Sequence, residues 1–261
     1  MIPGIVAQEV VTGGLIVNPG GVRFDNAVAN SYLEVLSCTE ADTPNLTISM
    51  WVRFPTTADV HGALFATWSN GNSKLAVGAN HYADLLGIAH GASSSLNVGT
   101  LEGVMTAAMW HHVFFSCQTS FGAGAKVHNL YIDGVSVYSA ADSADAGASF
   151  NIQFNGQSFD LPVHNGNTGK TDYADVWIAP GVYLDATNIT KFRSTAGNPV
   201  GLGSNGQTPT GSSPAFYFTS PATNFIFNHG SGDAVTLHGN CIDVDGPPTQ
   251  YRAHGVRFKN S

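Results

Sequence analysis

The chain has 261 residues and a formal net charge of −8; 11% of its residues are charged and 43% are hydrophobic. This balance excludes an intrinsically disordered chain and is typical of a folded β-protein with a surface rich in Ser, Thr and Asn. The negative charge and the lack of a Lys/Arg cluster argue against nucleic-acid binding. No apolar run approaches the ~20 residues that a membrane helix needs.

The N-terminal region, residues 1–21, is predicted to be an arm or a first strand. Its first residues, MIPGI, lack the basic start and the long apolar run of an ordinary signal peptide. Asn-Pro-Gly-Gly at 18–21 is a turn signal. Short strands are predicted to follow at 22–24 and 32–36.

The clearest strand lies at residues 45–55, NLTISMWVRFP. Its two alternating rows are Leu46, Ile48, Met50, Val52 and Phe54 on one side and Thr47, Ser49, Trp51 and Arg53 on the other. This period of two predicts a long, half-buried strand with the apolar row toward a core. Pro55 ends the strand because it cannot donate a ladder hydrogen bond. Residues 110–117 and 127–137 repeat the pattern, so we expect a fold organised around these three strands.

Turn residues predict two hairpins. Residues 63–68 and 74–77 flank a turn that contains Asn-Gly, and residues 127–137 contain Asp-Gly. Both dipeptides tolerate the positive φ angles that tight hairpin turns require.

The rest of the chain consists of short apolar runs separated by turn signals. Further strands are predicted at 85–89, 96–98, 150–154, 175–178, 182–184, 215–218, 225–227 and 234–237, and the only plausible helix at 185–193. Many strands with almost no helix predict an all-β fold, an antiparallel β-sandwich or jelly roll with one short helix.

The three cysteines, Cys38, Cys117 and Cys241, have no paired spacing. They therefore predict neither a zinc ribbon nor a disulfide framework. Cys117 falls in the inward row of its strand, so we expect a buried free thiol and synthesis in a reducing cytoplasm.

Three motifs together resemble the laminin G-like, concanavalin A-like jelly-roll family. They are residues 46–52 (LTISMWV), residues 110–113 (WHHV) leading to 130–135 (LYIDGV), and residues 175–178 (DVWI) before a loop and a short helix. The resemblance covers roughly residues 22 to 195 and implies the concanavalin A-like sandwich for this part of the chain.

A second resemblance lies downstream. Residues 191–194 (KFRS), 197–203 (GNPVGLG) and 206–211 (GQTPTG), followed by the aromatic run 215–218 (AFYF), are similar to a segment of virion proteins in tailed bacteriophages and prophages. The resemblance implies a structural or adhesion protein of a phage particle. The missing signal peptide fits this location, since virion proteins leave the cell by lysis.

These two resemblances divide the chain into three parts. We expect an N-terminal arm or strand at 1–21, a laminin G-like jelly-roll domain at 22–211, and C-terminal strands with an extension at 212–261.

An enzyme of this fold class would be expected to be a glucanase, which needs two carboxyl groups about 5 Å apart. Glucanases with this fold supply them as Glu-x-Asp-x-Glu or a close variant on one strand. None of the four glutamates, Glu9, Glu34, Glu40 and Glu102, lies in such a motif. We therefore expect a non-enzymatic protein and keep glycoside hydrolysis as a remote alternative.

Sugar binding would use exposed aromatic rings that stack on pyranose faces, with polar neighbours for the hydroxyl groups. The candidates are Trp51, Trp68, Tyr82, Tyr173 and Trp177. The competing interpretation is that Trp51 and Trp177 pack between a strand and a covering loop, which is common in sandwiches.

No cofactor is required by the sequence, although calcium is considered because relatives of this fold hold it with loop carboxylates. Asp172 and Asp175, or Asp243 and Asp245, are the candidate ligands, but no Asp-x-Asp-x-Asp-Gly loop is present. The ten histidines show no H-x-H or H-x-x-x-H spacing, and the adjacent His111 and His112 must point to opposite faces of a strand.

These observations favour a structural protein of a phage particle, either a head decoration or a tail or fibre component. It would be made in the host cytoplasm, form a homo-oligomer, contact other virion proteins and touch a host surface polysaccharide. A free-standing carbohydrate-binding module is the alternative. Neither hypothesis involves nucleic acid or insertion into a membrane.

Overall fold

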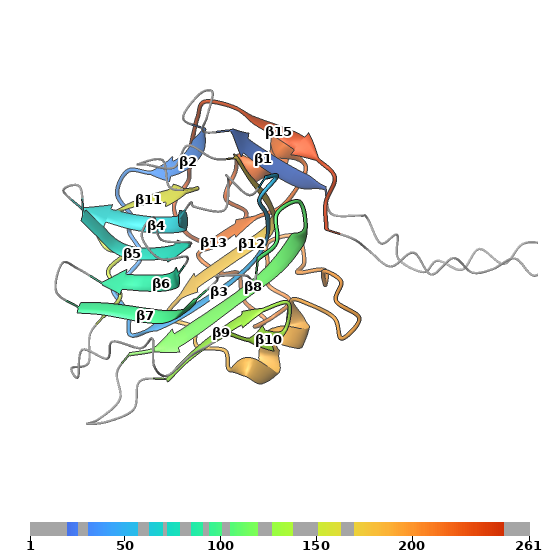
Figure 1. The fold of residues 1–261 in the computed structure, drawn as a ribbon. Coiled ribbons are helices and arrows are strands. Elements are labelled where there is room, and N and C mark those ends of the chain that lie inside the picture. Colours follow the sequence, from blue (N-terminus) through green and yellow to red (C-terminus); the bar gives the residue numbers. More distant parts are fainter. Residues whose placement is uncertain are drawn as a thin grey trace, which may run out of the picture.

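The computed structural model describes residues 20–25, 31–56, 63–69, 72–78, 85–90, 94–100, 105–119, 127–137, 151–162 and 170–247. Within these ranges two antiparallel sheets face each other as a sandwich (Figure 1). The prediction of an all-β antiparallel sandwich is confirmed.

The larger sheet has eight strands. In spatial order these are β10 (Val135–Ser136), β9 (Val127–Ile132), β8 (Trp110–Gln118), β3 (Asn45–Arg53), β12 (Lys170–Pro180), β1 (Gly21–Asp25) and β15 (Cys241–Val244). The eighth strand, β13 (Phe216–Phe218), pairs with the second half of β12, on the edge that β1 occupies along the first half. The three strands that the sequence singles out, β3, β8 and β9, are neighbours in this sheet.

The smaller sheet has five strands. Their order is β14 (Thr236–His238), β2 (Tyr32–Val35), β11 (Ser158–Leu161), β4 (Ala63–Ser69) and β5 (Asn72–Gly78). A separate hairpin of β6 (Leu85–His90) and β7 (Ser94–Thr100) lies beside β5 (Figure 1).

Both predicted hairpins are present. Strands β4 and β5 pair as far as Ser69 and Asn72, and β9 and β10 pair as far as Ile132 and Val135. In the second turn Asp133 has a φ of 53° and Gly134 a φ of 79°, the left-handed values that made Asp-Gly a hairpin signal.

The inward rows of the facing sheets form the main core. Leu46, Ile48, Met50 and Val52 of β3 are fully buried there, as the alternation predicted. Phe24 of β1 joins the same core. Cys117 is a buried free thiol, also as predicted, and Cys38 and Cys241 are free as well.

The outward row of β3 is buried too, which the sequence did not predict. Residues 181–211 fold back over the outer face of the larger sheet and pack their own apolar side chains on it. This second cluster consists of Phe114, Trp177, Ala179, Ile189, Phe192, Leu202 and Tyr217. The larger sheet is therefore covered on both sides over much of its length.

The covering segment contains the predicted short helix. It is the 3₁₀ helix η2 (Ala186–Lys191), which begins after Asp185, whose carboxylate accepts the backbone N–H of Thr187. A second helix, α2 (Ala222–Phe225), ends at the first residue of the strand expected at 225–227, and a turn and a bend follow at 226 and 227, so that strand and the prediction of a single helix are wrong.

Two other predictions of strands are corrected. The run at 150–154 forms only one isolated bridge, between Ile152 and Thr43. Of the expected pair at 175–178 and 182–184, the first belongs to one long strand, β12, which runs from Lys170 to Pro180, and the second forms no strand. A β-bulge at Asp175 and Val176 interrupts its pairing with β3, and this shift in register hides the alternation in the sequence.

The C-terminal strands join both sheets. Strand β14 extends the smaller sheet beside β2, and β15 follows after Gly239 and Asn240 and extends the larger sheet beside β1. No described helix is long and apolar enough to cross a membrane.

Candidate functional site

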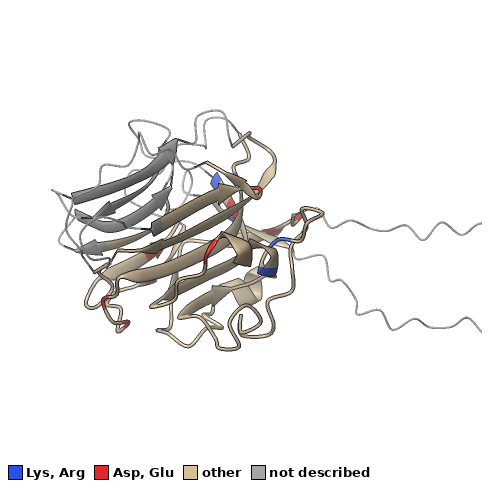
Figure 2. Cartoon of the chain, turned by 90° about the horizontal axis from the view of Figure 1, so that it is seen from below, with Lys and Arg blue, Asp and Glu red and all other residues tan. Residues whose placement is uncertain are grey.

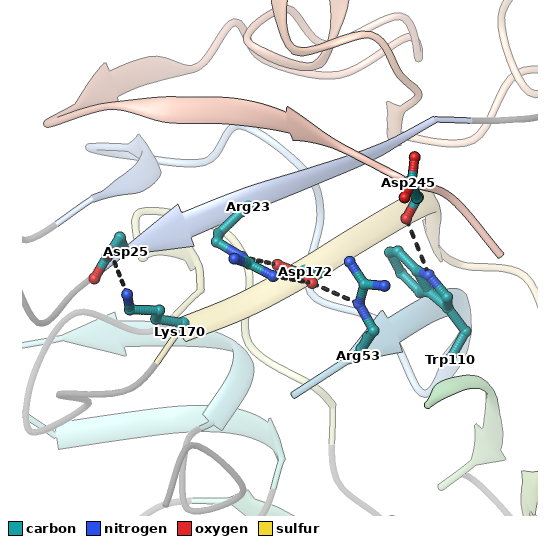
Figure 3. Close-up of polar contacts among 7 residues, drawn as sticks. All are labelled: Arg23, Asp25, Arg53, Trp110, Lys170, Asp172 and Asp245. Carbon is teal, nitrogen blue, oxygen red and sulfur yellow. Dashed lines mark hydrogen bonds and ion pairs between the residues drawn. The ribbon is translucent and has the colours of Figure 1, made fainter. Parts of the chain in front are cut away.

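Asp172 is the centre of an ionic cluster on the outer face of the larger sheet (Figure 3). Arg23 on β1 and Arg53 on β3 lie directly opposite it on the two neighbouring strands. The carboxylate accepts Nε–H of Arg23 at 2.6 Å, Nη2–H of Arg23 at 2.9 Å and Nε–H of Arg53 at 2.7 Å. Asp172 is fully buried, and these three charge-assisted bonds compensate its desolvation.

Trp110 of β8 holds the guanidinium of Arg53 from the other side. The centre of that guanidinium lies 4.9 Å from the centroid of the indole, a cation–π contact. The indole N–H donates to the backbone carbonyl of Asp245 at 3.1 Å (Figure 3). Trp110 also packs so closely on Gly21 that a Cβ there would lie 2.5 Å from a ring carbon. Arg53 is therefore fixed by a carboxylate and an aromatic ring together.

A shallow depression of about 500 Å³ opens beside this cluster, lined by Arg53, Asp243, Val244 and Asp245. One oxygen of Asp243 accepts the backbone N–H of Ala222 at 2.6 Å. Among the described residues, no hydrogen bond occupies the Nη groups of Arg53 or the carboxylate of Asp245. The depression thus offers both hydrogen-bond donors and acceptors to a ligand.

Charge elsewhere on the described surface is sparse. Figure 2 shows few Lys, Arg, Asp and Glu residues, dispersed without a patch of one sign. The ionic cluster and the depression beside it, with their paired charges, therefore stand out as a polar site on a mostly uncharged molecule.

The aromatic residues predicted to bind sugar do not form a binding platform. Trp51 is 3% exposed and lies against His112, and Tyr173 and Trp177 are fully buried. The hydroxyl of Tyr173 donates to the carbonyl of Leu64 across the core. Because none of these three rings presents a face to solvent, no sugar can stack on them; the packing interpretation holds for both tryptophans.

The other two candidate aromatics are less defined. Trp68 lies in β4, and Ser158 of β11 is its cross-strand partner, but its side chain is outside the described part of the structure. Tyr82 lies outside the described residues altogether.

The proposed calcium ligands serve other purposes. Both oxygens of Asp172 bind arginine, as described above. Asp175 occupies the bulge of β12 with a φ of 46°, and its Oδ1 accepts the hydroxyl of Thr219 at 2.8 Å. Burial raises the pKa of Asp175, although hydrogen bonds from Thr219 and Tyr217 oppose the shift. In the ranges that the structure describes, no three His, Cys, Asp or Glu side chains converge as a metal site requires.

The adjacent histidines do point to opposite faces. Nδ1 of His111 lies 2.7 Å from Oδ2 of Asp133, and Nε2 of His111 accepts the backbone N–H of Thr106 at 3.0 Å. His112 instead contacts the hydroxyl of Ser49 through Nε2 at 2.9 Å. The Thr106–His111–Asp133 arrangement resembles a catalytic triad, but the lone pair of Nε2 already accepts a backbone N–H, so the ring cannot act as a base there.

Sequence reasoning missed the residues that make the site. Arg23, Arg53 and Trp110 all lie in predicted strands, and the alternation of β3 already placed Arg53 in the outward row. That alternation could have identified the outward face, but it could not identify the strands that flank it.

The fold and the site define an antiparallel β-sandwich with a polar depression beside the ionic cluster of the larger sheet. A family model described as the Concanavalin A-like lectin/glucanases superfamily, of laminin G type, matches residues 26–178. The chain belongs to this family, and the predicted resemblance to it is confirmed. Strands β1, β13, β14 and β15 lie outside the matched range.

Solved structures agree with this fold. A heptameric SAP-like pentraxin from Limulus polyphemus superposes with a TM-score of 0.54 at 13% identity, over 88% of this chain and 96% of the pentraxin. The extracellular region of zebrafish Gpr126/Adgrg6 gives a TM-score of 0.51 at 10% identity, over 84% of this chain and 26% of that one. At these identities the likeness concerns the fold alone. No curated protein sequence matches the chain.

Proposed function

We propose that this protein is a non-enzymatic component of a tailed-phage particle, a head decoration or a part of the tail or fibre, that contacts host surface glycans. The location is supported by the resemblance of residues 191–211 to virion proteins. That segment is an integral part of the sandwich, since Phe192 and Leu202 pack in the cluster over the outer face.

The depression at Arg53, Asp243 and Asp245 carries the binding part of the proposal. Sugar hydroxyls both donate and accept hydrogen bonds, so they match a rim with free guanidinium N–H groups on one side and carboxylates on the other. The two carboxylates would repel an anionic ligand, and the guanidinium of Arg53 would repel a cationic one. A neutral polyhydroxylated ligand suits the depression best.

Hydrolysis is poorly supported at this site. Asp172 is the carboxylate at the centre of the cluster, and it is fully buried beneath two arginines. It can act neither as a nucleophile nor as a general acid there. If the protein releases reducing ends from a polysaccharide that it binds, the hydrolase alternative replaces this proposal.

Two variants test the binding site. Arg53→Ala keeps the two hydrogen bonds from Arg23 to Asp172 but removes the donors of the depression, and Asp245→Asn keeps the backbone carbonyl that Trp110 needs. Both should weaken binding on a glycan array about tenfold or more. Asp25→Asn is the matched control, because it also removes a carboxylate near the site but lies outside the depression, paired with Lys170 at 3.0 Å.

Quantitative mass spectrometry of purified particles from the source phage or induced prophage tests the location. Hundreds of copies per particle would indicate a head decoration or tail tube, and a small multiple of three or six a fibre, spike or baseplate. Absence from the particle, together with glycan binding, would overturn the virion proposal in favour of a free-standing lectin-like module.

A further inference from the structure

A six-residue motif occurs twice in the chain. Residues 21–26 read GVRFDN, and residues 255–260 read GVRFKN. The first five residues of the first copy form strand β1 (Gly21–Asp25), and the second copy lies beyond the described residues. Five of the six positions are identical, and the difference is Asp25 against Lys259.

Every shared residue of β1 from position 21 to 24 meets a specific demand of its place in the sheet. Gly21 is required because a Cβ would collide with the ring of Trp110. Val22 and Phe24 are fully buried, and Phe24 packs edge-on against Tyr173 with ring centroids 6.0 Å apart. Arg23 neutralises the buried Asp172. The repeated motif therefore contains the residues that the position between β12 and β15 requires.

The position of the second copy along the chain also suits this place. Strand β15 is antiparallel to β1, and its Val244 pairs with Gly21, where β1 begins. A strand equivalent to β1 would thus start where β15 ends. Residues 245–254 separate the two and can span up to about 33 Å when extended, enough to reach a neighbouring molecule.

We propose that residues 255–260 act as an exchange strand, which takes the place of β1 between β12 and β15 in a second copy of this chain. Val256 and Phe258 would enter the partner's core in place of its Val22 and Phe24, and Arg257 would bind its Asp172. A second copy is the occupant that we infer because the motif matches this chain's own slot. Adding or exchanging a strand joins subunits through contacts that the fold already contains.

The single difference in the motif regulates the exchange. Asp25 pairs with Lys170, whereas Lys259 in the same register would face Lys170 with like charge. The chain's own β1 therefore fits its slot better than the exchange strand does. An isolated molecule stays closed, and exchange is favoured where many copies are concentrated, as in an assembly.

The charge of the whole C-terminal segment also favours this association. Residues 248–261 contain Arg252, Arg257 and Lys259 and no acidic side chain, whereas the whole chain has a net charge of −8. On the partner, Asp243 lies opposite Val22 across the edge of this slot, and Asp245 follows the last residue of β15. The basic segment is thus attracted to an acidic rim at the place where it is proposed to bind.

The test is light scattering coupled to size exclusion over a range of concentrations of the full chain. The native protein should form dimers or larger species, and Phe258→Asp should weaken their association on the order of a hundredfold or more. Phe227→Asp is the matched control, since Phe227 is 60% exposed, and it should associate like the native chain.

Lys259→Asp gives the decisive result, because it restores the charge pair with Lys170. We expect it to strengthen association roughly two- to tenfold. A chain that is monomeric at all concentrations, or association that neither Phe258→Asp nor Lys259→Asp alters, would overturn the proposal. A change in amide hydrogen exchange at β12 in a protein that stays monomeric would also overturn the proposal, because it would indicate that the segment binds to its own molecule. None of these outcomes depends on whether the protein is found in a particle.

Discussion

Arg23 and Asp172 face each other across β1 and β12, and two parallel hydrogen bonds join the guanidinium to the buried carboxylate. This pair connects a strand outside the matched family range to one inside it. Replacing Asp172 by Asn would leave Arg23 and Arg53 without a counter-charge. Because the two arginine side chains are partly exposed, we expect a loss of about 2–4 kcal/mol in the free energy of unfolding, near the low end for broken buried pairs.

Urea unfolding measures this loss, and Asp25→Asn serves as its control. The Asp25–Lys170 pair is more exposed, so its removal should change stability by less than about 1 kcal/mol. Equal effects of the two substitutions would show that the ionic cluster has no special role in stability.

His112 should make the protein sensitive to acid. Burial lowers its pKa to about 3, with the charge of Arg193 acting in the same direction and that of Asp133 against it. The unfolded chain binds a proton near pH 6.5 and the folded chain does not, so stability is retained above pH 6.5 and lost as the pH falls toward 3. For this group alone, the free energy of unfolding changes by up to about 1.4 kcal/mol per pH unit, which is the linkage limit for one proton.

His112→Gln removes that proton and keeps a polar group near Ser49. Its unfolding free energy, measured between pH 7 and pH 4, should fall less steeply than that of the native chain. Parallel pH profiles for the two proteins would contradict the assignment.

Asp175 should affect the pH dependence of stability in the opposite direction to His112. Its pKa is raised in the folded state above the unfolded value of 3.8, so stability is lost as the pH rises from 3.8 through the folded pKa. Asp175→Asn keeps the acceptor for Thr219 and tolerates the positive φ, but carries no charge. We expect a higher melting temperature than native at pH 7, and a difference that shrinks as the pH falls through the folded pKa toward 3.8. A lower melting temperature at pH 7 would count against buried charge as the cause.

Trp177 should act in folding and not in sugar binding. Its indole N–H donates to the carbonyl of Gly206 at 2.8 Å and so fixes residues 181–211 on the sheet. Trp177→Phe should destabilise the protein by about 1–3 kcal/mol and speed proteolysis of that segment, through lost packing and one lost hydrogen bond. Glycan binding should be unchanged, whereas Trp110→Phe, which alters the support of Arg53, should reduce it. Loss of binding in Trp177→Phe at temperatures where the protein stays folded would contradict this division.

Strand existence was predictable wherever the alternation was long. β3 and β8 each span nine residues with one unbroken apolar row, and the Asp133–Gly134 turn fixed the register of the hairpin after β8. β12 was placed wrongly because its bulge at Asp175 shifts the alternation halfway along the strand. The run at 225–227 was predicted to be a strand because three residues are too few to distinguish a period of two from a helical turn.

The site could not be predicted because its residues are far apart in the sequence. Arg23 and Arg53 lie 149 and 119 residues from Asp172 in the chain, so no local pattern connects them. Trp177 and Trp51 had the chemistry of a sugar platform, but residue type does not report what covers a ring. The repeat of GVRF is visible in the sequence, but its meaning depends on the slot that Gly21 and Arg23 fill.

Local sequence thus determined which segments become strands, where hairpins turn and which row of β3 faces the core, because these follow from side-chain alternation and the φ angles of a few turn residues. The tertiary structure alone decided that the outer row is covered by residues 181–211 and that Arg53 remains open at the rim. Those outcomes depend on the packing of segments that are far apart in the chain, and a strand's periodicity gives two faces without saying what lies on either.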